Sequence, residues 1–225
     1  MVGFTQRLTL ADRLEKSFIE SFNSNCKEYR IIKYGMESTP LSGAHDYIRF
    51  CRNSTAKFIR YIPDSVIVRT DKKDNSIDSR NTTLIEFKAA ATGVRKDSFL
   101  QSVRRECKTG VLKPEHKEDI FNVEKDALDT YLSLNQMGVK TIIVAYANFR
   151  PPESRFLAQY VESIVVCSHY DPNTLGANTG SGTFVSNVNL MSFLNAKVLF
   201  STAFGLDIKM MNEVESDIQS AFDKI

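Results

Sequence analysis

Two acidic residues and a lysine occur in stretches that otherwise resemble apolar strands. Asp64 lies within "YIPDSVIV" (residues 61–68), and Glu86 and Lys88 lie within "TTLIEFKAA" (residues 82–90). A carboxylate that faces a protein core is costly unless a positive charge neutralises it. The pattern therefore predicts either an ion pair with a neighbouring lysine or a bound metal ion at these positions.

The alternation of side chains along a strand decides which of these residues can meet. Asp64 lies on the same face of its strand as Val66, and Glu86 lies on the same face as Leu84 and Lys88. If the two strands pair through the loop between them, Asp64 and Glu86 converge. Lys88 then lies about 6–7 Å farther along the same face.

Two carboxylates and a main-chain carbonyl oxygen, that of Phe87, would form an oxygen-only site of the kind that Mg²⁺ or Mn²⁺ prefers. Such an ion activates a water molecule for attack on a phosphodiester and neutralises charge in the transition state. Lys88 would orient or deprotonate that water, or stabilise the developing charge. The alternative is a surface ladder of ion pairs that has no function.

The residues Pro63-Asp64, followed by Glu86-Phe87-Lys88, resemble the motif of the PD-(D/E)XK nuclease superfamily. That motif is a Pro-Asp on one strand and a Glu-x-Lys on the next. The superfamily core runs helix, three-stranded meander, crossover helix, further strand, and this chain is similar over residues 9–147. The resemblance implies a restriction-endonuclease-like fold and a metal-dependent nuclease that usually acts on DNA.

A first helix is expected over residues 9–23, with Thr9 and Asp12 forming a capping box. Its apolar residues repeat at helical spacing and are Leu10, Leu14, Phe18 and Phe22. Glu15 falls inside this apolar arc. Because many superfamily members place a Glu on the first helix, the resemblance implies that Glu15 completes the metal site. A partly buried salt bridge is the other interpretation.

The remaining pattern predicts an α/β fold with a central mixed β-sheet flanked by helices. We expect strands over 29–34, 57–69, 82–89, 139–147 and 156–168. We expect helices over 123–137, capped by Asn122 and ended by Gly138, and over 210–224. Residues 1–225 are expected to form a single nuclease domain with its core at about 9–147. Residues 148–225 would then be a family-specific extension of that domain.

Two basic segments are candidates for contacts with DNA, residues 49–61 and residues 95–108. Acidic residues dilute the second segment, so ordinary charged surface is favoured there. Residues 49–61 combine positive charges with aromatic side chains, a mixture that suits phosphate binding or base stacking, although solvated surface is an equal alternative. The resemblance also implies a further polar residue at the start of the crossover helix, for which Glu124 and Lys125 are the candidates. The predicted DNA-binding residues are Arg49, Arg52, Lys57, Arg60, Arg104, Arg105 and Lys125.

Composition limits the other classes of function. The net charge of +2 means that any contact with nucleic acid must be a local patch. The four cysteines form no C-x-x-C pair, which disfavours a cysteine metal site. Neither a secretory signal nor an apolar run of membrane-spanning length is found, so we expect an intracellular, cytoplasmic protein without a membrane partner.

The sequence therefore predicts a Mg²⁺-dependent DNA endonuclease, with Mn²⁺ able to substitute. The expected specificity is for a sequence or a structure, and a restriction-type enzyme is favoured over a Holliday-junction resolvase or a repair nuclease. Cleavage of both strands needs two sites, which a homodimer supplies most simply. The rival from another class is a catalytically silent DNA-binding or assembly protein on the same fold.

Overall fold

The computed structural model describes residues 4–34, 54–70, 77–90, 120–170 and 185–223. The helices are α1 (Phe4–Asn25), α3 (Ser54–Tyr61), α5 (Lys125–Gln136), α6 (Ala196–Phe204) and α7 (Ile208–Asp223). The strands are β1 (Tyr29–Lys33), β2 (Ser65–Thr70), β3 (Ile77–Ala90), β4 (Ile120–Glu124), β5 (Lys140–Ala147), β6 (Phe156–Tyr160), β7 (Val165–Tyr170), β8 (Val185–Asn189) and β9 (Leu194–Asn195). Short 3-10 turns are η2 (Pro152–Ser154), η3 (Val161–Ser163) and η5 (Leu190–Ser192).

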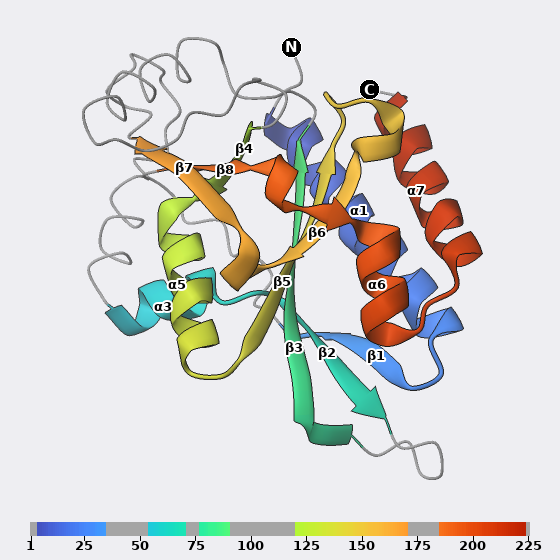
Figure 1. Cartoon of the computed structure of the whole chain (residues 1–225), viewed down its shortest axis with the longest axis horizontal. Helices are drawn as coiled ribbons and strands as arrows, with labels where there is room; N and C mark the ends of the chain where they lie inside the picture. The colour runs from blue at the N-terminus through green and yellow to red at the C-terminus, as the bar shows by residue number, and fades with distance from the viewer. Residues whose placement is uncertain (1–3, 35–53, 71–76, 91–119, 171–184, 224–225) are drawn as a thin grey trace.

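The central sheet has six strands in the order β1-β2-β3-β5-β6-β9 (Figure 1). Its strands pair antiparallel except for β3 and β5, which are parallel and joined through α5. This arrangement confirms the predicted α/β class with a central mixed sheet flanked by helices. A separate three-stranded sheet, β4-β8-β7, was not predicted.

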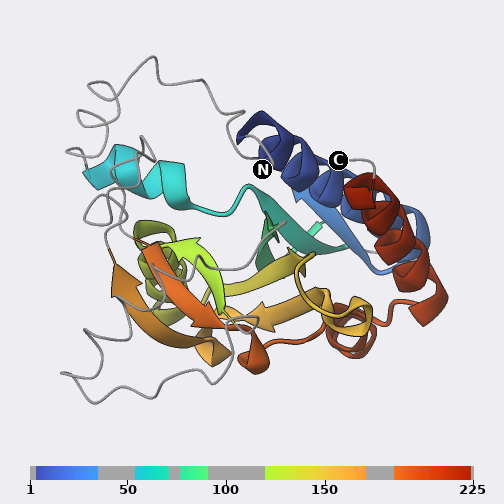
Figure 2. The ribbon, with the colours of Figure 1, turned by 90° about the horizontal axis from the view of Figure 1, so that it is seen from above.

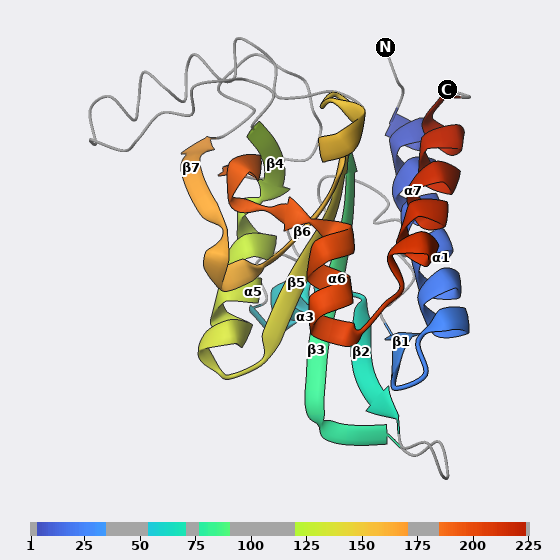
Figure 3. The ribbon, with the colours of Figure 1, turned by 45° about the vertical axis from the view of Figure 1, so that its right-hand side comes forward.

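Each face of the central sheet supports its own hydrophobic core, and the alternation along β5 shows the division. Ile142, Val144 and Tyr146 face a core shared with α1, α6 and α7. Ile143 and Ala145 face the opposite core, which includes α5 and strands of the smaller sheet. Figure 3 shows this layering, with α1 and α7 side by side on one side of the sheet and α5 and β4 on the other. The view from above agrees (Figure 2).

Helix α1 lies on the sheet through the predicted apolar stripe. Leu14, Phe18 and Phe22 are fully buried, and the ring of Phe18 contacts that of Phe87 on β3 with centroids 5.3 Å apart. Burial of such side chains contributes about 1.5–3 kcal/mol each. The helix begins at Phe4, so Thr9 lies inside it and the predicted capping box is wrong.

Three other local predictions were wrong. Residues 54–61 form the helix α3, whereas a strand was expected from residue 57. Asn122 lies in β4 opposite Asn187 and does not cap α5, which begins at Lys125. Residues 156–168 are divided by η3 into β6 and β7, which belong to different sheets.

The strands predicted over 29–34, 82–89 and 139–147 are confirmed as β1, part of β3 and β5. The last helix is confirmed as α7. Gly138 follows α5 with a φ of 85°, a backbone conformation that glycine adopts without strain. In the described ranges, none of the helices combines the length and apolar character needed to cross a membrane.

Candidate active site

Asp64 and Glu86 lie opposite each other at the point where β2 begins. The last paired residues of β2 and β3 are Ser65 and Ile85, and the antiparallel register continues by one position to Asp64 and Glu86. The carbonyl oxygen of Asp64 accepts a 2.9 Å hydrogen bond from the amide of Tyr34, so Asp64 is held in line with β1 as well. Asp64 itself precedes β2, and continuation of this register places its side chain on the face of Glu86, as strand periodicity predicts.

Lys88 lies two residues beyond Glu86 on the same strand and forms an ion pair with it. Its Nζ is 2.6 Å from Oε1 of Glu86, and the two side chains are only 30% and 14% exposed. Burial lowers the pKa of Lys88, but the nearby carboxylates of Glu86, Glu124 and Asp64 raise it, and the net direction is upward. Lys88 is thus a protonated lysine at neutral pH that faces three carboxylates.

The Asp64 carboxylate lies in a field that disfavours its charge. Partial loss of hydration raises its pKa, and the negative charges of Glu86 and Glu15 raise it further. Lys33 and Lys88 oppose this shift without cancelling it. Within the described ranges, no hydrogen bond to the Asp64 carboxylate is present. A carboxyl group whose pKa is raised by burial and by a neighbouring carboxylate is a candidate for a functional site.

Glu15 comes from α1, which covers the face of the sheet opposite to Glu86, and its carboxylate already has two partners. Oε2 lies 2.9 Å from Nζ of Lys33, and Oε1 accepts a 3.1 Å hydrogen bond from the hydroxyl of Ser65. The side chain of Glu15 is 14% exposed. This pairing accounts for a charge inside the apolar arc of the helix, and the charge still acts on Asp64.

Tyr34 continues the row of Asp64 and Glu86 at the edge of the sheet. Loss of hydration, followed by the charges of Asp64 and Glu86, raises the pKa of Tyr34 to about 12. Its phenol therefore stays protonated at neutral pH. Tyr34 is 45% exposed, so the residue is in contact with solvent as well as within the field of the two carboxylates.

Tyr131 is a member of the site that the sequence analysis did not identify. It lies on α5, is fully buried, and its hydroxyl donates a hydrogen bond to the Glu86 carboxylate. Burial raises its pKa well above the usual value, and the charge of Glu86 adds to the shift. In the sequence, Tyr131 is simply one residue of an apolar helical stripe. The one feature of the sequence that could have indicated its role is the hydroxyl of Tyr131, because the other buried residues of this stripe are purely apolar.

The oxygen atoms of the site fit a hard divalent cation in part. Among the described residues, no three His, Cys, Asp or Glu side chains are grouped closely enough to hold a metal ion. The fitting donors are the carboxylates of Asp64 and Glu86 and the carbonyl oxygen of Phe87, with water molecules completing the coordination. A Mg²⁺ or Mn²⁺ ion there would relieve the mutual repulsion of Asp64 and Glu86.

The structure describes only some of the predicted DNA-binding residues. Arg49, Arg52, Arg104 and Arg105 lie outside the described residues. Lys57 and Arg60 belong to α3, whose backbone alone is described at these positions. Lys125 opens α5 and forms an ion pair with Asp129, four residues later.

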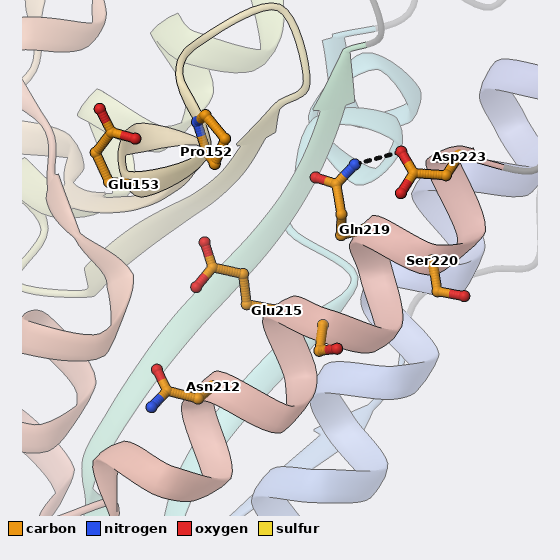
Figure 4. A pocket seen from close by; sticks show the side chains of 8 residues that line it. Pro152, Glu153, Asn212, Glu215, Gln219, Ser220 and Asp223 are labelled. Atoms are coloured by element: carbon orange, nitrogen blue, oxygen red, sulfur yellow. Dashed lines mark hydrogen bonds between the residues drawn. The ribbon is translucent and has the colours of Figure 1, made fainter.

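Cavities of appreciable size lie elsewhere on the molecule. One of about 620 Å³ lies between η2 and α7, with Glu153, Glu215 and Asp223 in its lining (Figure 4). Its wall includes Gln219, whose amide nitrogen donates a 2.5 Å hydrogen bond to Asp223. Another, of about 610 Å³, lies along α1 and α7. Neither is lined by Asp64, Glu86 or Lys88.

Comparison of the chain with protein-family models, with curated proteins and with solved structures found no match.

Proposed function

We propose that this protein is a divalent-metal-dependent DNA endonuclease of the PD-(D/E)XK type. The observation that carries the proposal is the position of Asp64 opposite Glu86, with Lys88 two residues farther along the same face. Lysine and paired carboxylates in this order match the motif Pro-Asp followed by Glu-x-Lys. A ladder of surface ion pairs without function would alternate positive and negative charges. It would not place the two carboxylates of Asp64 and Glu86 close together.

The order of the elements supports a restriction-endonuclease-like core. Helix α1 precedes the antiparallel strands β1, β2 and β3, with α3 inserted between β1 and β2. Strand β4 and α5 then lead to β5, which pairs parallel with β3. Apart from α3 and β4, this is the order helix, meander, crossover helix, strand that the resemblance implies. Strands β6 and β9 widen the same sheet, so residues beyond 147 contribute to the body that supports the site.

In the proposed reaction, Asp64, Glu86 and the carbonyl oxygen of Phe87 would hold Mg²⁺, or Mn²⁺ in its place. When bound, such an ion would lower the pKa of a coordinated water and offset negative charge on the phosphate. Lys88 holds the attacking water and donates hydrogen bonds to the developing charge. Glu15 acts through its negative charge, because Lys33 and Ser65 already bind its oxygens.

The proposed substrate is DNA, cut at a specific sequence or structure. Cleavage of both strands would use two copies of the site, and a homodimer provides them. A restriction-type enzyme is favoured over a junction resolvase or a repair nuclease, and its place of action would be the cytoplasm.

One observation favours a second candidate, a catalytically silent DNA-binding protein on the same fold. The 2.6 Å ion pair between Lys88 and Glu86 neutralises one of the two carboxylates without any metal. A protein that binds no metal at this site would be stable with Glu86 paired to Lys88. The two candidates differ in what they do to DNA after binding it.

The distinguishing experiment compares the wild type with Lys88→Ala in binding and cleavage of duplex and branched DNA. For a nuclease, the variant keeps its affinity for DNA in Ca²⁺, while cleavage in Mg²⁺ disappears. A silent binding protein binds DNA in both forms and cleaves in neither. A chain that neither binds nor cleaves DNA overturns both candidates.

A further inference from the structure

Glu86 is held by two donors on the face of the sheet that α5 covers. Lys88 contacts Oε1 from the same strand, and the hydroxyl of Tyr131 donates a hydrogen bond from α5. Glu86 lies beside Ile143 in the register of β3 and β5, and Ile143 belongs to the same core as Tyr131. The carboxylate therefore lies between its own strand and the crossover helix.

The ring of Tyr131 has a fixed position. Only 2% of the residue is exposed, and the same buried core contains Phe121, Leu128 and Ala145. A hydroxyl on a ring packed this tightly points in one direction, because the ring cannot change rotamer without displacing its neighbours. A hydrogen bond from such a group fixes the orientation of the carboxylate that accepts it.

We propose that Tyr131 is a positioning residue that orients the Glu86 carboxylate for a divalent metal ion. This inference rests on the proposed function, since it assigns Glu86 as a ligand. Groups that donate hydrogen bonds to ligating carboxylates fix the geometry of the ligand, and their loss typically lowers metal affinity about 10–100-fold. Tyr131 does not touch the ion or the DNA and acts only through Glu86.

The test is a calorimetric titration of Mn²⁺ into the wild type and the variants Tyr131→Phe and Asp64→Asn. Phenylalanine retains the ring and its packing, so the fold is kept while the hydroxyl is lost. We expect the dissociation constant of Tyr131→Phe to rise about 10–100-fold. In single-turnover cleavage, its rate falls at low Mn²⁺ and recovers as the Mn²⁺ concentration is raised.

Two matched controls separate positioning from general damage. Tyr146→Phe removes another hydrogen-bonded phenol, which contacts Gln219 on the opposite face of the sheet, and should bind Mn²⁺ like the wild type. Leu128→Ala loosens the core around Tyr131 and keeps the hydroxyl, so it lowers thermal stability without a comparable loss of Mn²⁺ affinity.

The possible outcomes are distinct. If the wild type binds Mn²⁺, Asp64→Asn abolishes binding and Tyr131→Phe binds like the wild type, the positioning role is overturned and the proposed function stands. If the wild type binds no Mn²⁺ and cleaves no DNA, both are overturned. A loss in Tyr131→Phe that Leu128→Ala reproduces in full also overturns the positioning role.

Discussion

Asp64 and Glu86 each lie one position beyond Ser65 and Ile85, the last residue pair of β2 and β3, and the charge of Glu86 acts on Asp64. β3 continues past this point to Ala90 and pairs there with β5. Two like charges at the place where two strands separate weaken the fold and favour a cation. The predictions below follow from this relationship and from the groups that surround it.

Replacing Asp64 with Asn should make the protein more stable at neutral pH. The pKa of Asp64 is raised above 3.8 in the folded state, so the fold binds the proton more tightly than the unfolded chain does. Ionisation of Asp64 therefore costs stability as the pH rises through the folded pKa. The gain in melting temperature of Asp64→Asn should shrink as the pH is lowered from neutral toward 3.8. A gain that is absent at pH 7, or that grows in acid, contradicts this.

Removal of the Lys88 charge should reduce both activity and stability. In Lys88→Met the cleavage rate should fall about 10²–10³-fold, the usual loss when one hydrogen-bond donor to a developing charge is removed. Urea unfolding should show a loss of about 1–3 kcal/mol, because the largely buried Glu86 carboxylate loses a hydrogen-bond donor. The double variant Glu86→Gln/Lys88→Met should recover part of this stability, and its failure to do so would argue against a coupled pair.

The Lys88–Glu86 pair also predicts a dependence of stability on alkaline pH. The pKa of Lys88 is raised above 10.5, because the neighbouring carboxylates outweigh the effect of burial. The contribution of the pair is therefore complete below 10.5 and is lost as the pH rises through the folded pKa. The stability gap between the wild type and Lys88→Met should narrow only above this value. A gap that narrows between pH 7 and 9 would point to another group.

Glu15 should contribute to metal binding less than Asp64 does. Its carboxylate is shared by Lys33 and Ser65, so Glu15→Gln removes a nearby charge and keeps an acceptor for Ser65. We expect a loss in Mn²⁺ affinity of less than about tenfold, within the range for groups that do not bind the ion directly. Abolition of binding, as expected for Asp64→Asn, would instead identify Glu15 as a ligand.

Gly138 should be the most sensitive position in the connection between α5 and β5. Its φ of 85° is unfavourable for residues with a Cβ atom, although an added Cβ would meet no atom within 4 Å. Gly138→Ala should therefore cost about 1–2 kcal/mol through backbone strain alone, or about 2–8 °C in melting temperature. Gly138→Asn should cost less because Asn tolerates positive φ better. Equal losses in the two variants would contradict this explanation.

The face that Glu86 and Lys88 share could be predicted from the sequence because it depends only on local geometry. Side chains alternate along a strand, so the spacing from Glu86 to Lys88 fixes a shared face in any register. The pairing of Asp64 with Glu86 required only that neighbouring strands form a hairpin, as β2 and β3 do. The stripe of Leu14, Phe18 and Phe22 likewise depends on helical periodicity alone.

The errors arose where distant contacts decide the structure. Residues 54–61 contain aromatic and branched side chains that favour a strand, yet they form α3, which buries Tyr61 against the core containing α5 and exposes Phe58. Asn122 has the residue type of a helix cap, but its segment pairs with β8. Its partner there is Asn187, about 65 positions farther along the chain. The contact of Tyr131 with Glu86 depends on how α5 lies on the sheet, which residue spacing does not reveal.

The most direct test of the account is cleavage of supercoiled plasmid in Mg²⁺, in Mn²⁺ and in EDTA by the wild type, Asp64→Asn and the control Asp217→Asn. Asp217 lies on α7 and is exposed, away from the proposed ligands. The account predicts cleavage by the wild type and the control in either metal, none in EDTA, and none by Asp64→Asn. Cleavage that persists in Asp64→Asn, or that is absent in the wild type with both metals, would contradict it.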